Sequence, residues 1–159
     1  MAIKKTNAMR ELDKAKIKYD IFEYDVDENY LGAVSVASKT GADITKVFKT
    51  LALTNDKDEL FIVCIPGSDE VDLKKVASIV QSKKVDMLEL SKLKEKTGYI
   101  RGGCSPIGIK KRHLSLIHES CLKKDFIFIS GGQRGLQIKI SPNDLINFLN
   151  MEVKNLIIE

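Results

Sequence analysis

A glycine-rich loop at residues 99–112 holds the groups best suited to bind an anion. Gly102 and Gly103 accept backbone angles that other residues avoid, and they let a ligand approach the main-chain N–H groups closely. Ser105 adds a hydroxyl group, and a basic run follows at residues 110–112. This composition indicates a ligand-binding loop, whereas a plain turn is the alternative that any Gly/Pro-rich stretch allows.

A second glycine-rich loop, residues 130–135, has the sequence Ser-Gly-Gly-Gln-Arg-Gly. Its spacing matches neither the P-loop nor the dinucleotide-binding fingerprint, and by itself it would be interpreted as a hairpin connection. Ser130 and Gly131 could nevertheless meet the first loop, so that both loops supply N–H and hydroxyl donors to one anion or oxyanion. Beyond the loop, Gln137 alternates with apolar residues and faces either solvent or a cleft.

Lys49 interrupts an otherwise aliphatic strand face. Residues 47–55 are expected to form a strand, in which Lys49 shares a face with Val47, Leu51 and Leu53. Removing an unpaired ammonium from water costs free energy, so such a lysine usually has a partner or a shifted pKa. The pattern favours a functional Lys49; the alternative is a lysine near the strand end that reaches solvent.

The usual catalytic groups are few. His113 and His118 are the only histidines, and both adjoin a basic segment, which disfavours a histidine metal site or a catalytic triad. Cys104 has no neighbouring histidine to activate it, and cysteine often serves as a small packing residue. With Cys64 and Cys121 it makes an odd, widely spaced set that fits no disulfide framework. We therefore expect no metal site, no nucleophilic Cys104 and a reducing, cytoplasmic location.

Length and composition indicate one globular domain over residues 1–159. The chain has 43% hydrophobic and 30% charged residues, a net charge of +4, and no apolar run long enough to cross a membrane. The N-terminal charges precede no hydrophobic signal segment. Several lysine pairs would allow weak, salt-dependent contact with a phosphate backbone, although single pairs are usually just solvated.

Hydrophobic periodicity and turn residues predict an α+β fold. The expected helices cover residues 6–17, 33–40, 72–80, 91–96 and 141–149. The expected strands cover residues 19–24, 47–55, 59–65, 85–87, 114–117, 126–129 and 136–140, and a hairpin turn at 55–58 joins two of them. Because strands and helices do not alternate regularly, we expect a mixed or antiparallel sheet rather than a doubly wound one.

Four segments resemble the YbaK/EbsC family of bacterial Cys-tRNA(Pro)/Cys-tRNA(Cys) deacylases, which is related to the editing domain of prolyl-tRNA synthetase. The segments are residues 47–51, 72–75, 102–112 and 130–136. The paired patterns GGxSPxGxKKR and SGGxRGL are specific, and they resemble the cysteine-specific branch more than the alanine-specific one. The resemblance covers nearly the whole chain and implies a single α+β domain with a mixed, barrel-like sheet flanked by helices.

The resemblance implies a trans-editing enzyme that removes cysteine from mischarged Cys-tRNA(Pro), beside prolyl-tRNA synthetase and without metal or cofactor. In the family mechanism the substrate's own thiol attacks the ester, and the product leaves as a cyclic thioester. Lys49 and Gly102 would be the catalytic residues. The implied substrate pocket contains Tyr24, Tyr30, Thr50 and Ser130, and the two glycine loops and the strand after them add Gly103, Ser105, Gly131 and Gln137.

Two positions differ from the family pattern, and two other functions stay open. Relatives can carry aspartate at the position of Gln137, and the aromatic residue at the position of Tyr30 is commonly phenylalanine. One alternative is a deacylase that acts on Ala-tRNA(Pro). The other is a non-catalytic module that binds acceptor-end RNA or a synthetase, which the basic clusters suit equally well.

Overall fold

The computed structural model describes residues 4–25, 37, 41 and 43–159 of the chain. Within them the α-helices are α1 (Asn7–Lys14), α3 (Leu73–Ile79), α4 (Leu90–Thr97) and α5 (Pro142–Leu149), and the short 3-10 helices are η1 (Ile44–Lys46) and η2 (Glu119–Lys123). The predicted helix at 33–40, apart from Ala37, and the predicted pocket residue Tyr30 lie outside the described residues. The other predicted helices form within a few residues of their expected bounds.

The helix ends follow the capping residues that the sequence offers. Thr6 Oγ1 accepts a hydrogen bond from the Met9 N–H at 3.3 Å, and Asp72 Oδ1 caps α3 in the same way. Gly98 ends α4 with a left-handed φ of 85°. Ser141 occupies the N-cap position of α5 but makes no capping hydrogen bond through its side chain, so the start of that helix depends on the proline that follows.

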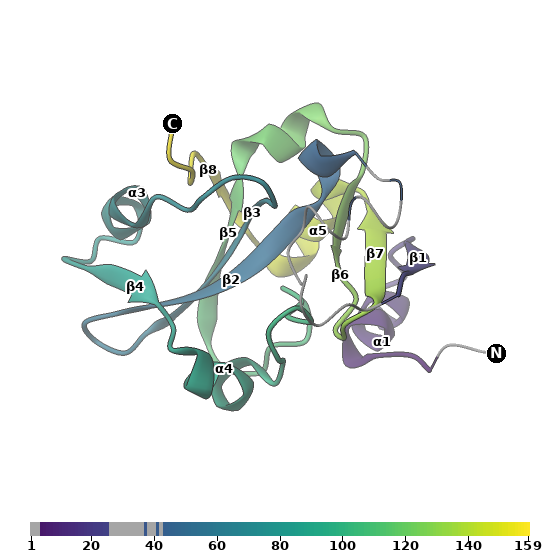
Figure 1. Ribbon diagram of the computed structural model, residues 1–159, viewed down its shortest axis with the longest axis horizontal. Helices are drawn as coiled ribbons and strands as arrows, with labels where there is room; N and C mark the ends of the chain where they lie inside the picture. The colour runs from purple at the N-terminus through teal and green to yellow at the C-terminus, as the bar shows by residue number, and fades with distance from the viewer. Residues whose placement is uncertain (1–3, 26–36, 38–40, 42) are drawn as a thin grey trace.

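The strands form two sheets (Figure 1). One is the three-stranded antiparallel sheet β1-β7-β6, made of β1 (Asp20–Glu23), β7 (Leu136–Ile140) and β6 (Ile127–Ser130). The other is the mixed five-stranded sheet β4-β2-β3-β5-β8, made of β4 (Val85–Met87), β2 (Phe48–Asn55), β3 (Leu60–Pro66), β5 (His113–His118) and β8 (Glu152–Lys154). β2 and β3 form the predicted hairpin, whereas β3–β5 and β5–β8 are parallel pairs.

The α+β fold with mixed strand pairing is confirmed. The strands lie in two sheets that do not close into a barrel. Among the described residues, an isolated parallel bridge between Val47 and Phe128 links the main chains of the two sheets. The strand β4 is too short to cover the edge of β2, because it pairs with that edge only at Leu53–Asn55. Part of the β2 edge therefore stays without a strand partner in the described part of the chain.

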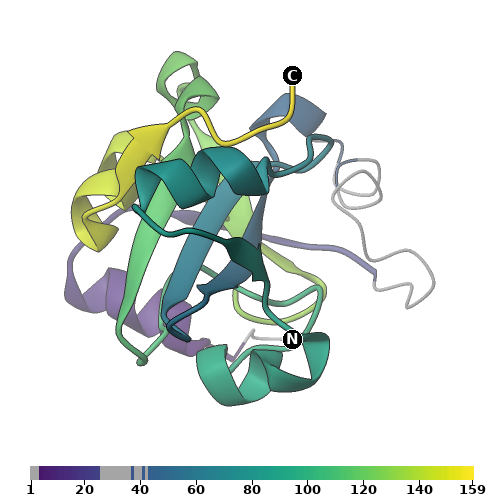
Figure 2. The same ribbon diagram turned by 90° about the vertical axis from the view of Figure 1, so that its left-hand side faces the viewer.

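Two layers of apolar side chains hold the sheets. On one face of the five-stranded sheet, Leu53 and Val63 pack against Val76 of α3 and against the buried Leu156 near the C-terminus. Figure 2 shows α3 lying across these strands. The other face packs against the three-stranded sheet, α1 and α5, in a core that includes the following side chains: Phe48, Cys64, Ile117, Ile129, Ile138, Met9, Leu12 and Leu145.

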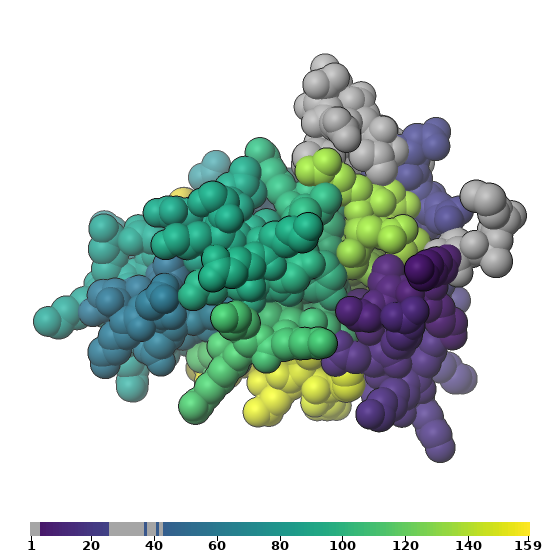
Figure 3. Space-filling model, turned by 90° about the horizontal axis from the view of Figure 1, so that it is seen from below, coloured from purple at the N-terminus to yellow at the C-terminus, as the bar shows by residue number. Residues whose placement is uncertain are grey.

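The underside of the molecule is formed by α4 and α1, with the chain that follows α4 between them (Figure 3). Leu88 and Leu93 in the α4 region pack on Ala52, Leu60 and Ile62, so α4 is fixed against the end of the β2–β3 hairpin. The first glycine loop, residues 99–112, begins directly after α4. Because α4 packs on β2, the loop also lies next to that strand.

Candidate active site

A cavity of about 450 Å³ runs along β2. Its lining residues come from both sheets, from α4 and from the first glycine loop: Tyr24, Val47, Phe48, Lys49, Thr50, Leu51, Ala52, Met87, Leu88, Leu90, Leu93, Arg101, Gly102, Cys104, Ser130 and Gln137. The lining includes every residue from Val47 to Ala52. Since neighbouring side chains of a strand point to opposite faces, the cavity must border the edge of β2 rather than one face of the sheet.

The open edge of β2 turns main-chain groups toward this cavity. The Leu88 N–H donates to the Ala52 carbonyl at 2.9 Å, so the peptide groups of Ala52 point away from β3. Peptide groups alternate in direction along an antiparallel strand, and those of Thr50 therefore point the same way. No strand pairs with Thr50 on that side in the described part of the chain. An N–H donor and a C=O acceptor are thus available at the middle of the cavity.

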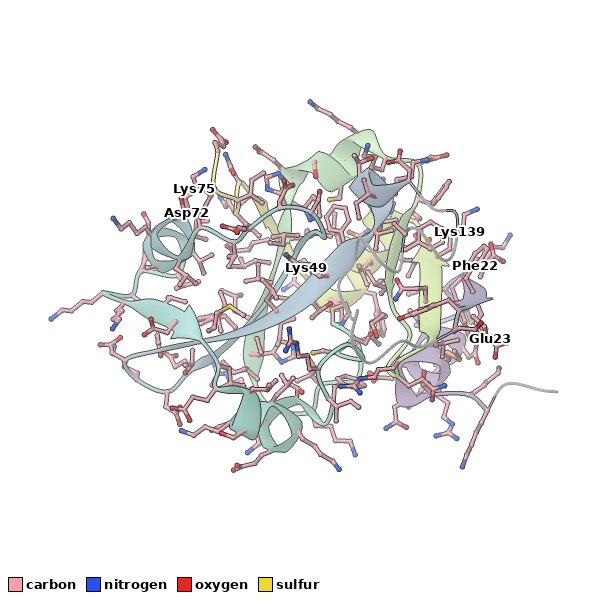
Figure 4. All side chains as sticks on the ribbon, viewed as in Figure 1. Phe22, Glu23, Lys49, Asp72, Lys75 and Lys139 are labelled. Carbon is pink, nitrogen blue, oxygen red and sulfur yellow. The ribbon has the colours of Figure 1, made fainter. Side chains whose placement is uncertain are left out.

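Lys49 is the second residue of β2, and Figure 4 shows it near the middle of the view. Its side chain is half-buried, and it makes no hydrogen bond and no ion pair with any described residue. Burial lowers the pKa of the Lys49 ammonium, while the carboxylates of Glu70 and Asp69 oppose that shift. As the strand pattern predicted, Lys49 stands on the face of Leu51 and Leu53. An ammonium without a close partner is suited to meet an anionic ligand or a developing negative charge.

Gln137 brings an unsatisfied acceptor to the cavity. It pairs directly with Ser130 across β6 and β7, so both residues reach the cavity from the three-stranded sheet. The Gln137 side chain is only 6% exposed, and its Oε1 has no hydrogen-bond partner among the described residues. Its Nε2 donates only a long bond of 3.5 Å to the Leu136 carbonyl. Since a buried acceptor without a donor costs about 1–3 kcal/mol, this position favours a ligand that donates a hydrogen bond.

The two glycine loops meet, as the sequence predicted. A Cβ atom on Gly103 would lie 3.0 Å from the Cα of Gln133 and 3.1 Å from the Arg134 nitrogen, so only glycine permits this close packing. The Arg134 Nε also donates to the Arg101 carbonyl at 2.8 Å. The second loop is held from its other side by Thr6, whose hydroxyl donates to the Gly131 carbonyl at 2.6 Å. These contacts fix Gly102 beside the cavity.

The structure brings most of the predicted site residues to one place. Those that line the cavity are Tyr24, Lys49, Thr50, Gly102, Ser130 and Gln137. The remaining ones lie behind it or outside the described residues. Gly103 and Gly131 pack within the loops, and the buried Ser105 hydroxyl accepts from the Ile107 N–H at 3.3 Å. Tyr30 is the predicted residue that the structure does not describe.

Sequence reasoning missed the apolar part of the lining, which comes from Met87, Leu88, Leu90 and Leu93. These residues lie in or beside the predicted strand at 85–87 and the predicted helix at 91–96. Their irregular apolar pattern gave no sign that they line a binding cavity.

Cys104, which the sequence disfavoured as a nucleophile, also lines the cavity. Burial raises the pKa of its thiol to about 11, so it stays protonated and weakly nucleophilic at neutral pH.

The described residues contain no group of three or more His, Cys, Asp or Glu side chains arranged to hold a metal ion. None of the helices in the described part of the chain is both long and apolar enough to pass through a membrane. The polar groups of the cavity lining are the Lys49 ammonium, the Arg101 guanidinium, the Cys104 thiol, the Gln137 amide, the hydroxyls of Tyr24, Thr50 and Ser130, and main-chain groups.

Comparison with known proteins identifies the class to which a chain with this fold and cavity belongs. The aminoacyl-tRNA editing domain family matches residues 27–148. A protein of Enterococcus faecalis (strain ATCC 700802 / V583), named "Putative Cys-tRNA(Pro)/Cys-tRNA(Cys) deacylase EbsC", is 42% identical over 146 residues, which are 92% of this chain and 89% of that protein. The chain belongs to the aminoacyl-tRNA editing domain family.

A more distant sequence relative and two solved structures of similar fold were also found. "Uncharacterized protein YwhH" of Bacillus subtilis (strain 168) is 25% identical over 129 residues, which are 79% of this chain and 82% of that protein. The solved structure of "hypothetical protein APE2540" superposes with a TM-score of 0.87 at 16% identity and covers 95% of this chain and 99% of its own. That of "a putative trans-editing enzyme for prolyl tRNA synthetase" has a TM-score of 0.82 at 20% identity and covers 94% of both chains.

Proposed function

We propose that the protein is a trans-editing deacylase that removes cysteine from mischarged Cys-tRNA(Pro). The relative that is 42% identical carries this activity in its name and is covered over 89% of its length. The observation that carries the proposal is Lys49, a half-buried ammonium that has no close partner among the described residues. It lies in a cavity where the thiol of Cys104 is kept protonated. A site of this kind suits a substrate that brings its own nucleophile.

In the proposed reaction, the thiol of the esterified cysteine loses its proton and the sulfur attacks the ester carbonyl carbon. The new C–S bond closes a four-membered cyclic thioester, and the bond from the carbonyl carbon to the ribose oxygen breaks. The ribose oxygen takes up a proton, and water later opens the thioester to give free cysteine. Because the nucleophile is part of the substrate, the protein's task is to position the ester and to stabilise charge.

Several cavity residues have a defined part in this proposal. Lys49 stabilises the negative charge that develops on the ester oxygen, and the N–H groups at Gly102 and at the open edge of β2 donate to it. The unpartnered Oε1 of Gln137 accepts a hydrogen bond from the substrate's α-ammonium group. Although Gln137 has no charge of its own, an amide oxygen can accept this bond. Tyr24 and Ser130 close the same end of the cavity.

The partners follow from the substrate. The protein would meet the acceptor end of tRNA(Pro) in the cytoplasm, beside prolyl-tRNA synthetase, without requiring a metal ion.

Purified protein should deacylate Cys-tRNA(Pro) much faster than Ala-tRNA(Pro), in the presence of a chelator as well as in its absence. Preference for Ala-tRNA(Pro) would favour the alanine-specific alternative. Salt-sensitive tRNA binding without any deacylation would favour a binding module.

Cys104 tests whether the nucleophile is the substrate's or the protein's. Cys104→Ala should keep most of the deacylase activity, because the Cys104 thiol has a pKa of about 11 and takes no part in the reaction. Loss of activity in a variant that retains the wild-type melting temperature would instead identify Cys104 as the nucleophile.

A further inference from the structure

The two ends of the cavity differ in chemistry. At one end, where β2 starts beside the three-stranded sheet, Ser130 and Gln137 supply polar groups. At the other end, where the Leu88 N–H is bonded to the Ala52 carbonyl, the lining is aliphatic. From Val47 to Ala52 the strand rises by about 17 Å, at about 3.3 Å per residue. A cysteinyl group bound near Gln137 and Lys49 would leave the aliphatic end unfilled.

The aliphatic end is a wall that remains open to solvent. Leu93 is partly buried and packs on the core under α4, which anchors the wall. Leu90, the first residue of α4, is 60% exposed, and Met87 is 46% exposed. Figure 3 shows α4 on the outside of the molecule. Large exposed apolar side chains that line a cavity gain free energy when a ligand covers them, at about 25 cal/mol per Å² of apolar surface.

We propose that this wall, formed by Met87, Leu88, Leu90 and Leu93, binds the adenine base of the substrate's 3′-terminal nucleoside. The assignment rests on the proposed function, because it orients an aminoacyl ester of adenosine along β2. The cysteinyl group lies at the Gln137 end, the ester lies at Lys49, and the ribose leads to the wall. A nucleobase has flat apolar faces that pack on such side chains. Arg101, which also lines the cavity, supplies a cation for the nucleotide's phosphate.

A binding experiment with two probes that lack the aminoacyl ester measures the contribution of the adenine base alone. Adenosine 5′-monophosphate and ribose 5-phosphate are titrated into the wild-type protein, into Leu90→Ser and into Leu122→Ser. Leu122 is a matched control, because it is 59% exposed and lies on η2, away from the cavity lining. The wild type should prefer the nucleotide over the sugar phosphate. Leu90→Ser should weaken nucleotide binding by about fivefold or more and leave sugar-phosphate binding unchanged, whereas Leu122→Ser should change neither.

Equal affinity of the wild type for the two probes would overturn the proposal, as would equal nucleotide binding by Leu90→Ser and the wild type. Kinetics gives the second readout: Leu90→Ser should raise KM for Cys-tRNA(Pro) with little change in kcat. The two proposals fail in distinguishable ways. A protein that deacylates Cys-tRNA(Pro) but binds the nucleotide independently of Leu90 refutes the base subsite alone. A protein that binds the nucleotide through Leu90 but deacylates no tRNA refutes the deacylase function.

Discussion

Lys49 lies on β2 and Lys75 lies on α3, the helix that packs on the five-stranded sheet, and their surroundings differ (Figure 4). The Lys75 ammonium donates to the Ile157 carbonyl at 2.7 Å and to Asn155 Oδ1 at 3.3 Å, and it lies 3.5 Å from a Glu159 carboxylate oxygen. Lys49 makes no such bond with any described residue. Lys75 therefore ties the C-terminal segment to α3, whereas the charge of Lys49 is left for a ligand in the cavity.

Two further buried groups repeat this contrast. Near Lys75, the His118 Nδ1 accepts the Leu156 N–H at 3.1 Å and so holds the same C-terminal segment. In the cavity, the Gln137 Oε1 has no partner among the described residues. Since an unpaired buried polar group lowers stability, its presence beside Lys49 indicates a site shaped for a ligand rather than for folding alone.

The largest expected effect comes from Lys49→Ala. This variant should lose about 100-fold or more in kcat/KM for Cys-tRNA(Pro), because the charge that stabilises the ester oxygen is gone. Its melting temperature should stay close to that of the wild type, since no bond to a described residue is lost. Deacylation kinetics and thermal unfolding measure the two effects. A fully active Lys49→Ala protein would refute the assignment of the site.

Lys75→Ala should show the opposite pattern. Removing the bonds to Ile157 and Asn155 should lower the free energy of unfolding by about 1 kcal/mol, because both bonds are partly exposed. Deacylase activity should be unchanged at a temperature where the variant is folded. If Lys75→Ala lost as much activity as Lys49→Ala, the claim that Lys75 serves stability and Lys49 serves the substrate would be contradicted.

Gln137→Leu should separate activity from stability. The variant removes a buried acceptor that has no partner in the described part of the chain, so its free energy of unfolding should equal or exceed that of the wild type. Its kcat/KM should fall by about tenfold, because the substrate's ammonium loses one hydrogen bond to the protein. Chemical denaturation and deacylation assays test both parts. Reduced stability together with full activity would show that Gln137 serves the core and not the substrate.

The smallest effect concerns His118 and pH. Burial lowers the pKa of His118 below its ordinary value, while Glu119, Asp69 and Glu159 oppose the shift and Lys75 adds to it. The folded protein therefore binds this proton less readily than the unfolded chain does. The contribution of His118 to stability is fully present above the unfolded pKa of about 6.5 and is lost as pH falls toward the folded pKa.

Unfolding experiments between pH 8 and pH 5 should show this loss in the wild type. His118→Gln keeps a polar side chain that does not titrate, so part of the pH dependence should disappear in that variant. An identical pH dependence of the wild type and His118→Gln would show that other groups cause it.

Much of the local structure was predictable because short-range rules decide it. Asp72 and the apolar spacing after it defined α3, and the turn at residues 55–58 defined the β2–β3 hairpin. The glycines of the two loops indicated their close contact, and the strand pattern singled out Lys49. Each of these features depends on residues that are close together in the sequence, so local sequence patterns are enough to predict it.

The rest depends on which strands pair. Long-range packing decides the parallel pairing of β3 with β5. It also decides that part of the β2 edge has no strand partner among the described residues. The cavity exists because β4 stops after three residues, which no local pattern indicated as important. For the same reason the aliphatic wall at Met87 and Leu90 was not predicted as part of the site. The family resemblance implied a mixed, barrel-like sheet, and the strand pairing adds that the strands divide into two sheets that do not close.

The most direct test of the central proposal compares Cys-tRNA(Pro) with Ser-tRNA(Pro). The two substrates differ in one atom, sulfur or oxygen, at the position of the proposed nucleophile. A thiol ionises far more readily than a hydroxyl and is the better nucleophile near neutral pH. The account predicts that kcat/KM for the cysteinyl substrate is at least about 100-fold higher. Equal rates for the two substrates would contradict the proposal that the substrate's thiol attacks its own ester.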